Sequence, residues 1–177
     1  THAITSKISH HAVLFPLEDL EKEGLIKLSY VDIDKSGMIS ISHLKELLES
    51  NPRTFVSIMH ANNEIGTIQN IKEIGDICKK HNAIFHSDTV QTMAHFPFDM
   101  QKLNVDFMAA SAHKFHGPKG VGFVYISENI WINPLLRGGG QERNMRAGTE
   151  NVYGIAALAM AMEMAYENLE EETDYIK

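Results

Sequence analysis

The sequence predicts an α/β fold in which a mostly parallel sheet is sandwiched by helices. Segments typical of strands and of helices alternate along all 177 residues, as they do where helices connect parallel strands. Hydrophobic residues make up 44% of the chain, and a chain of this length can bury a core of its own. No repeat, low-complexity tract or linker interrupts it, so we expect a single domain over residues 1–177.

The predicted strands are short and largely apolar. They cover residues 3–6, 26–31, 54–59, 83–86, 107–110 and 122–126. Between the last two strands only a short turn follows residues 111–114, and no crossover helix fits there. We therefore expect the strand at 122–126 to pair antiparallel with its neighbour.

The predicted helices cover residues 12–23, 42–48, 70–81 and 151–172. Gly24 follows the first helix as a C-cap. Asn70 and Glu73 form a capping-box pattern at the start of the third. The long last helix carries apolar residues at helical spacing, namely Ile155, Leu158, Met162, Ala165 and Leu169.

The composition excludes several classes of protein. The formal net charge is −7, whereas nucleic-acid modules normally carry a basic excess. No apolar run approaches the ~20 residues of a membrane span. A single cysteine, Cys78, excludes an intrachain disulfide, and the lack of a signal-peptide pattern makes a cytoplasmic protein the expectation. Because the chain begins at Thr1 rather than Met, we expect it to be a piece of something longer.

One segment resembles the start of an EF-hand calcium loop. Within residues 32–40, oxygen-bearing side chains fall at positions one, three, five and nine, and Gly37 falls at position six. The twelfth position is His43, so the bidentate glutamate that completes the calcium cage is missing. Residues 28–31 before it are typical of a strand rather than a helix. We therefore expect an aspartate-rich turn here.

Polar segments follow three of the predicted strands, at residues 60–66, 86–91 and 111–114. Ligand sites in parallel sheets lie at the carboxyl ends of the strands. Asp88 and Lys114 would thus lie at neighbouring strand tips. A partly desolvated lysine can form a Schiff base with an aldehyde, and an aspartate can keep a pyridinium nitrogen protonated, which is what pyridoxal 5′-phosphate requires. Spacing alone leaves open that the two are unrelated surface or ion-pair residues.

Five segments together resemble the cysteine desulfurases, which are class V, fold-type I pyridoxal-phosphate enzymes. In chain order they read SKISH (6–10), NNEIG (62–66), HSDTVQ (86–91), SAHKFHGPKG (111–120) and GGGQERNMRAGT (138–149). The last two resemble the NifS/IscS subgroup most. The motifs span nearly the whole chain, and the resemblance implies the large-domain fold of these enzymes.

The resemblance implies roles for five residues around the cofactor ring. Lys114 would form the Schiff base with the cofactor and shuttle the substrate α-proton. Asp88 would pair with the pyridinium nitrogen, and Gln91 would hydrogen-bond the phenolic oxygen. His10 would stack on the ring face and count with Lys114 as catalytic. Asn63 would lie beside the cofactor and the substrate carboxylate.

Three further residues are implied in phosphate binding. Ser111 and His113 would hold the phosphate within the subunit, and Thr149 would reach a phosphate across the interface of a homodimer. Blander alternatives stay open, since His10 can be a core or surface histidine and Ser111 can simply cap a turn. No His-Glu-x-x-His pattern and no paired cysteines occur, so no metal site is expected.

The chain also departs from the family pattern. These enzymes are about twice as long, and neither the upstream phosphate-binding turn nor the small domain with its catalytic cysteine and its arginine is present. Cys78 lies mid-helix among apolar residues, so a buried structural thiol is expected there. We therefore expect residues 1–177 to be the central part of the cofactor-binding large domain and to be inactive alone.

The intact enzyme implied by the resemblance would convert L-cysteine to L-alanine. Its sulfur would leave as an enzyme persulfide for iron–sulfur cluster assembly or tRNA thiolation, with sulfur-acceptor or scaffold proteins as partners. Two other hypotheses stay open. One is a selenocysteine lyase, which shares these motifs. The other is a non-catalytic fragment that keeps the fold and the dimer surface.

Overall fold

A six-stranded sheet forms the centre of the computed structural model, which describes residues 1–51 and 53–176. Its strands run in the order β2-β1-β3-β4-β5-β6. Their bounds are β1 (His2–Thr5), β2 (Lys27–Tyr30), β3 (Thr54–Met59), β4 (Ile84–Asp88), β5 (Phe107–Ser111) and β6 (Gly122–Ile126). The first five strands are mutually parallel, and β6 pairs antiparallel with β5. The predicted sheet and its antiparallel last strand are confirmed.

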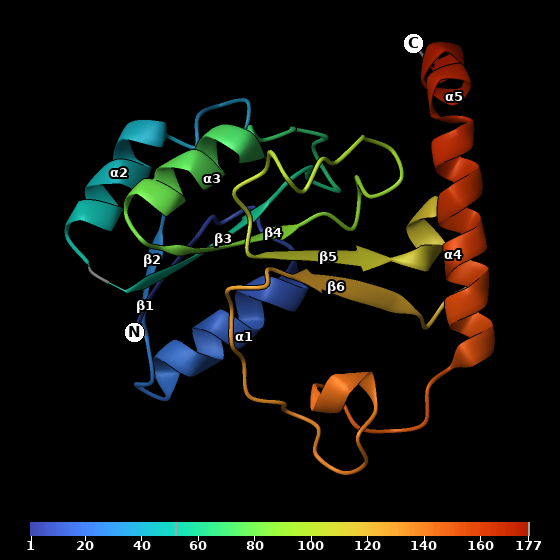
Figure 1. Cartoon of the computed structure of the whole chain (residues 1–177). Helices are drawn as coiled ribbons and strands as arrows, with labels where there is room; N and C mark the ends of the chain where they lie inside the picture. Colours follow the sequence, from blue (N-terminus) through green and yellow to red (C-terminus); the bar gives the residue numbers. More distant parts are fainter. Residues whose placement is uncertain (52, 177) are drawn as a thin grey trace.

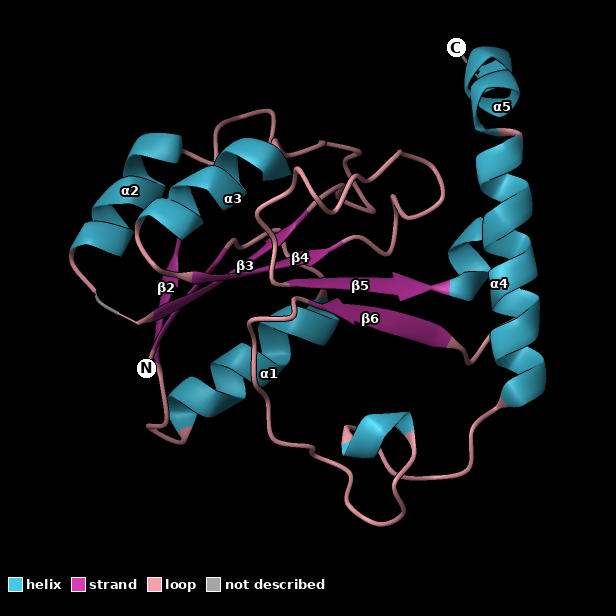
Figure 2. Ribbon diagram, in the orientation of Figure 1, coloured by secondary structure: helices cyan, strands magenta, loops and turns pink. Residues whose placement is uncertain are grey.

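Helices flank this sheet on both faces, as Figures 1 and 2 show. They are α1 (His11–Lys22), α2 (Ile41–Glu49), α3 (Ile71–Lys80), α4 (Val152–Glu167) and α5 (Leu169–Ile176), with short 3₁₀ turns η1 (Ala112–Phe115) and η2 (Glu142–Asn144). α1 covers one face, α2 and α3 cover the other, and α4 stands beside η1 at the carboxyl end of β5. Asn70 accepts the amide of Glu73 at the start of α3, as the capping pattern predicts.

Two apolar clusters hold these layers together, because alternate strand residues point to opposite faces. On the α1 side, Leu17 packs with Ala3 and Leu28. The larger cluster joins the inward side chains of the strands to α2 and α3; it includes Ile4, Leu44, Val56, Ile74, Phe85 and Met108. The sheet is thus fixed on both faces, and its carboxyl edge is left to carry polar residues.

The predicted helix over 151–172 is wrong in one respect, because it is two helices. α4 ends at Glu167 and α5 begins at Leu169. The side-chain amide of Asn168 donates to the carbonyl of Met164 at 2.8 Å. Asparagine side chains that bond nearby backbone groups compete with the helical pattern. Apolar periodicity continues through this position and therefore gave no sign of the break.

The segment that resembles a calcium loop is a turn closed by its own aspartate. Asp34 accepts hydrogen bonds from the amide and hydroxyl of Ser36 and from the amide of Met38. A bridge between Ile33 and Ile39 closes it. The predicted aspartate-rich turn is confirmed. Among residues 1–51 and 53–176, no helix has the length and apolar character needed to cross a membrane.

Candidate functional site

The carboxyl edge of the parallel strands gathers most of the predicted site residues. His10 follows β1, Asn63 follows β3, Asp88 ends β4, and Lys114 follows β5. The register pairs Met59 with Asp88 and Asp88 with Ala109, and neighbouring strands lie about 4.8 Å apart. Residues far apart in the sequence therefore meet along one edge of the sheet.

Asp88 is buried at the centre of this edge, with 7% of its surface exposed. Its backbone carbonyl accepts the amide of His60 at 2.9 Å. Its Oδ1 accepts the amide of Val90 at 3.0 Å. Among the described residues, Oδ2 has no recorded donor, so this oxygen can accept a hydrogen bond from a bound group.

Lys114 lies in η1, directly after β5. Ala112 and Phe115 are fully buried, and residues three apart share a face of a 3₁₀ turn. They anchor the turn and leave Lys114 half-buried between them. His116 follows in the left-handed region with φ of 65°, and the amide of Gly117 donates to the carbonyl of Ala112 at 2.8 Å. Buried side chains and this backbone hydrogen bond therefore hold the conformation of the turn.

Ser111 and His113 form a polar pair beside the lysine. The Ser111 hydroxyl and His113 Nδ1 lie 2.8 Å apart. Ser111 makes no side-chain cap of η1, which speaks against the alternative that it simply caps this turn. Both groups are accessible to solvent in part or in full, and each can donate a hydrogen bond to an anion.

His10 and Asn63 border one cavity of about 270 Å³, lined by residues 7–11 and 62–65. His10 is exposed, and its Nδ1 accepts the amide of Ala12 and caps α1. The ring proton of a neutral His10 must then sit on Nε2. Asn63 is exposed and donates to the side chain of Glu64 at 2.7 Å. The structure therefore places these two residues on one cavity.

The segment after β4 carries Gln91, which is half-buried. A buried histidine, His60, supports it through a 2.9 Å hydrogen bond between Nδ1 and the Thr92 hydroxyl. The His60 ring also packs edge-on against Phe96 and Phe98. Burial lowers the pKa of His60 to about 4, so it is neutral at physiological pH.

Sequence reasoning missed three supporting residues. His60 holds the Gln91 segment, Asn62 donates to the carbonyl of Ile8 at 2.6 Å, and His95 contacts the carbonyl of Lys114 at 2.9 Å. His60 and Asn62 lie in the polar segment after β3, and their position at the end of a strand could have indicated a role in the site. His95 lies in no motif, and nothing in the sequence pointed to it.

Thr149 does not follow a strand of the parallel sheet as the other predicted site residues do, because it lies just before α4. It is exposed in the long segment between β6 and α4, which runs beneath the sheet in Figure 1. In the same segment Glu142, Arg143 and Asn144 all have positive φ, a conformation that costs energy for residues other than glycine. Gln141 accepts the amide of Gly148 and closes the loop.

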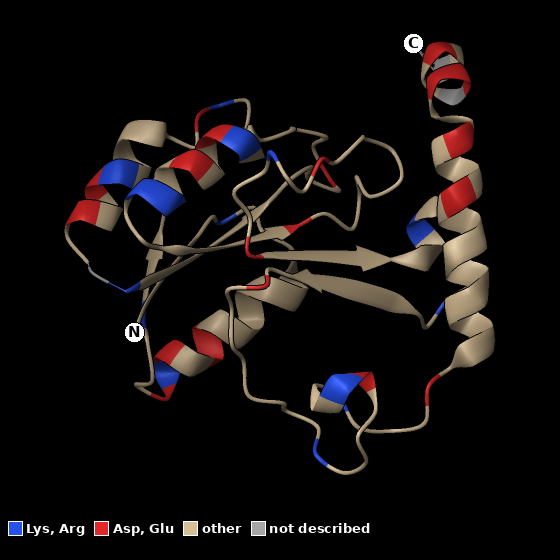
Figure 3. Cartoon of the chain, in the orientation of Figure 1, with Lys and Arg blue, Asp and Glu red and all other residues tan. Residues whose placement is uncertain are grey.

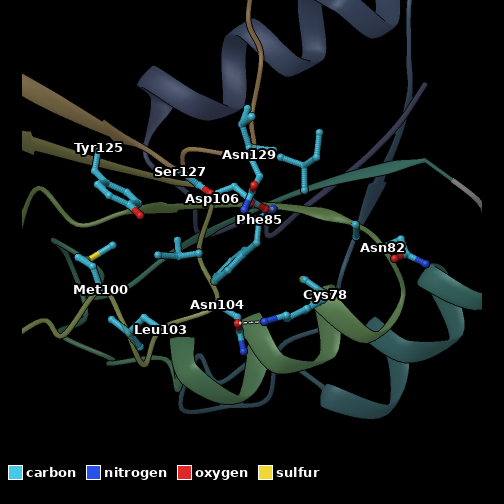
Figure 4. Close-up of a pocket in the computed structure, with 15 residues that line it drawn as sticks. Cys78, Asn82, Phe85, Met100, Leu103, Asn104, Asp106, Tyr125, Ser127 and Asn129 are labelled. Carbon is cyan, nitrogen blue, oxygen red and sulfur yellow. Dashed lines mark hydrogen bonds between the residues drawn. The ribbon is translucent and has the colours of Figure 1, made fainter.

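A second cavity, of about 380 Å³, lies at the opposite, amino edge of the sheet (Figure 4). Its polar groups bond one another, since Lys79 donates to Asn104 and Asp106 accepts the amide of Phe85. Cys78 lies at its floor with 0% exposure. Burial first, and then the charge of Asp106, raises the pKa of this thiol to about 12. The predicted buried structural thiol is confirmed.

Comparison with known proteins identifies the family. Residues 1–175 match the family model Aminotransferase class-V, so the chain belongs to this family. Among its relatives is a cysteine desulfurase IscS from Clostridium botulinum, 49% identical over 173 residues, which are 98% of this chain and 43% of the relative. A cysteine desulfurase IscS from Methanosarcina thermophila is 50% identical over 170 residues, 96% of this chain and 42% of the relative.

Solved structures agree with this assignment and confirm the predicted fold class. A NifS-like protein superposes with a TM-score of 0.91 at 47% identity, covering 96% of this chain and 47% of the other. SspA in complex with cysteine superposes with a TM-score of 0.84 at 37% identity, covering 92% and 47%. The chain therefore spans a little under half the length of these relatives.

Proposed function

We propose that this chain is the cofactor-binding part of a pyridoxal 5′-phosphate-dependent cysteine desulfurase that converts L-cysteine to L-alanine. The observation that carries the proposal is the meeting of Asp88, Lys114, His10 and Asn63 at one edge of the sheet. The names of the relatives support the activity, and the cysteine complex of SspA supports the substrate. Within that enzyme, residues 1–177 would form the central part of the large domain.

The residues at the site fit pyridoxal phosphate. The buried Asp88 carboxylate has Oδ2 open to a donor, which suits a protonated ring nitrogen. Lys114 supplies a primary amine one strand away. Ser111 and His113 supply adjacent donors for a phosphate. This cofactor needs three features: a carboxylate for the ring nitrogen, an amine for the aldehyde and hydrogen-bond donors for the phosphate.

The roles proposed for the chain's own side chains come from the family resemblance, and these positions are compatible with them. When bound, pyridoxal phosphate acts as an electron sink that acidifies the α-proton of an amino acid. Lys114 would take that proton on Nζ and return it. Asp88 would keep a proton on the ring nitrogen of the bound cofactor, because a buried carboxylate favours a nearby positive charge. Gln91 would donate to the phenolic oxygen, and His10 would pack against the ring.

Substrate and phosphate are held by the remaining residues. Asn63 orients the substrate carboxylate, while Ser111 and His113 bind the phosphate. Thr149, exposed in the segment before α4, would bind the phosphate in the partner subunit of a homodimer. An exposed apolar stripe on α4 supports the dimer: Tyr153, Met160 and Met164 are 91%, 57% and 55% exposed. Figure 3 shows that charges on α4 are confined to its C-terminal part.

A cysteine thiolate would attack the substrate sulfur, so that an S–S bond forms as the Cβ–S bond breaks. The thiolate would become a persulfide, and the electron pair left on Cβ would be protonated to give the methyl group of alanine. Cys78 does not serve, since a thiol shut in the core cannot reach the substrate. We place the sulfur-accepting thiolate outside residues 1–177. The persulfide would then supply iron–sulfur cluster assembly or tRNA thiolation in the cytoplasm, through acceptor or scaffold proteins.

Chemical trapping tests the proposal. The chain is incubated with pyridoxal phosphate, reduced with borohydride and digested, and the modified peptide is mapped by mass spectrometry. We expect the label on Lys114, with Lys114→Ala unlabelled and Lys119→Ala labelled as the parent. A label on Lys119 or elsewhere with Lys114 clean would overturn the assignment.

A further inference from the structure

A histidine outside every recognised motif is bonded to the backbone of the proposed attachment lysine. His95 Nε2 lies 2.9 Å from the carbonyl oxygen of Lys114. A carbonyl oxygen only accepts, so Nε2 must carry the hydrogen. This holds for the neutral ring with its proton on Nε2 and for the doubly protonated ring. The donor is therefore present in either charge state of His95.

The turn that carries Lys114 needs such a donor. Helix ends leave backbone carbonyls without partners inside the helix, and η1 is only four residues long. The carbonyl of Ala112 accepts the amide of Gly117. The carbonyl of Lys114 is taken by His95 from a different part of the chain. The side chain of His95 thus completes the backbone bonding of this turn.

His95 is itself held firmly. Its backbone amide donates to the carbonyl of Thr92 at 3.0 Å. Ala94 before it adopts a positive φ of 65° while 2% exposed, and its amide bonds the Tyr166 hydroxyl of α4. The same hydroxyl donates to the carbonyl of Phe96. A rigid segment therefore presents the imidazole to η1.

We propose that His95 is a positioning residue that fixes Lys114 relative to Gln91. Gln91 and His95 lie in one segment after β4, whereas Lys114 lies after β5. Besides the His95 contact, the strand ladder and the bonds of Thr89 to the Ala109 carbonyl join this region, and Met93 and Ala94 share one apolar cluster with Ala112 and Phe115. Among the described residues, the His95 contact is the side-chain hydrogen bond that reaches the backbone of Lys114 itself. That Lys114 and Gln91 face the same cofactor rests on the function proposed above. The effect of His95 on the turn does not.

Two variants whose side chains are of similar length distinguish the effect of the hydrogen bond from the effect of packing. His95→Gln keeps an N–H donor at a similar reach, and His95→Met removes it. Backbone hydrogen exchange at residues 115–117 is measured without cofactor, and borohydride-trapped labelling of Lys114 is measured with it. His81→Gln and His81→Met, at the opposite edge of the sheet, are the matched controls.

We expect His95→Gln to resemble the parent in both measurements. In His95→Met the amides of residues 115–117 should exchange about three- to tenfold faster, and Lys114 labelling should slow by a similar factor, which is the effect of one hydrogen bond. Equal behaviour of the two His95 variants, including failure of both to fold, overturns the proposal. If the parent itself does not label at Lys114, the function above fails, while the exchange rates still decide the role of His95.

Discussion

Asn62 donates from its side-chain amide to the carbonyl oxygen of Ile8, 54 positions away in the sequence, at 2.6 Å. Its Oδ1 accepts the amides of Glu64 and Ile65 at 2.8 and 3.0 Å. One buried side chain therefore fixes the segment after β1 to the segment after β3. His10 and Asn63 belong to these two segments, so their common cavity depends on Asn62.

Replacing Asn62 should loosen this edge of the sheet. Asn62→Ala leaves the Ile8 carbonyl and two amides without partners, and an unsatisfied buried group costs about 1–3 kcal/mol. Urea unfolding should show a loss of this size. Asn63→Ala, an exposed neighbour, should change stability by less than about 0.5 kcal/mol. If Asn62→Ala lost no more stability than Asn63→Ala, Asn62 would not be what holds the two segments together.

Asp88→Asn should keep the fold and weaken cofactor binding. The amide oxygen still accepts the Val90 amide, but the negative charge that stabilises a ring cation is lost. Hydrogen bonds to charged groups contribute about 1.5–3 kcal/mol, so affinity for pyridoxal phosphate should fall more than about tenfold. Absorbance titration measures this, and Asp106→Asn at the opposite edge should bind as the parent does. Unchanged affinity in Asp88→Asn would show that the carboxylate does not face the ring.

His60 should make the chain sensitive to acid. Its folded pKa of about 4 lies below the unfolded value of about 6.5. The stability it contributes is therefore present above pH 6.5 and is lost as pH falls toward 4. His2 and His86, whose pKa values burial also lowers, add to the same window.

The pH dependence of urea unfolding checks this contribution. His60→Gln should flatten the loss of stability between pH 6.5 and 4, whereas the exposed His11→Gln should not. A single group contributes at most about 1.4 kcal/mol per pH unit. A parallel pH dependence in the parent and His60→Gln would mean that His60 is not buried as a neutral ring.

The 177-residue chain should not release sulfur from cysteine in repeated turnovers. With a pKa of about 12, Cys78 is thiolate in only about one molecule in 10⁴ at pH 8, and it lies in the core. The assay is alanine and sulfide release with pyridoxal phosphate supplied, compared with Cys78→Ser. Turnovers by the parent that disappear in Cys78→Ser would make Cys78 the nucleophile after all.

The α4 stripe should control association. Light scattering with size-exclusion chromatography should find a dimer of the parent chain. Met160→Glu places a charge in the stripe and should raise the dimer dissociation constant at least tenfold, which is about 1.4 kcal/mol. Lys45→Glu, on the exposed side of α2, should leave it unchanged. A dimer equally stable in Met160→Glu would place the interface elsewhere.

Much of the fold was readable from the sequence because its strands are apolar runs between turn residues. The prediction for 54–59 matches β3 to the residue, and the short turn before β6 indicated its antiparallel pairing. β4 runs two residues beyond its prediction, to Asp88. Ser87 and Asp88 are polar, and only their pairing with β3 and β5 makes them strand.

Part of the candidate site could likewise be predicted from the sequence, and part could not. Strand tips in a parallel sheet share an edge, so the nearness of Asp88 and Lys114 follows from the order of elements. Their chemical roles came from resemblance to a family and stay predictions. The contact between His95 and Lys114 spans 19 positions and depends on the path of a loop, which neither periodicity nor a motif describes.

The seclusion of Cys78 makes this protein convenient for site-specific labelling. Its one thiol is closed to maleimide reagents while the chain is folded, so a cysteine introduced at the surface would be the sole point of attachment. Lys80→Cys, at the exposed end of α3, would carry a fluorophore on the edge of the sheet farthest from Lys114. The rate at which Cys78 itself reacts with the reagent would then report how often the whole chain unfolds.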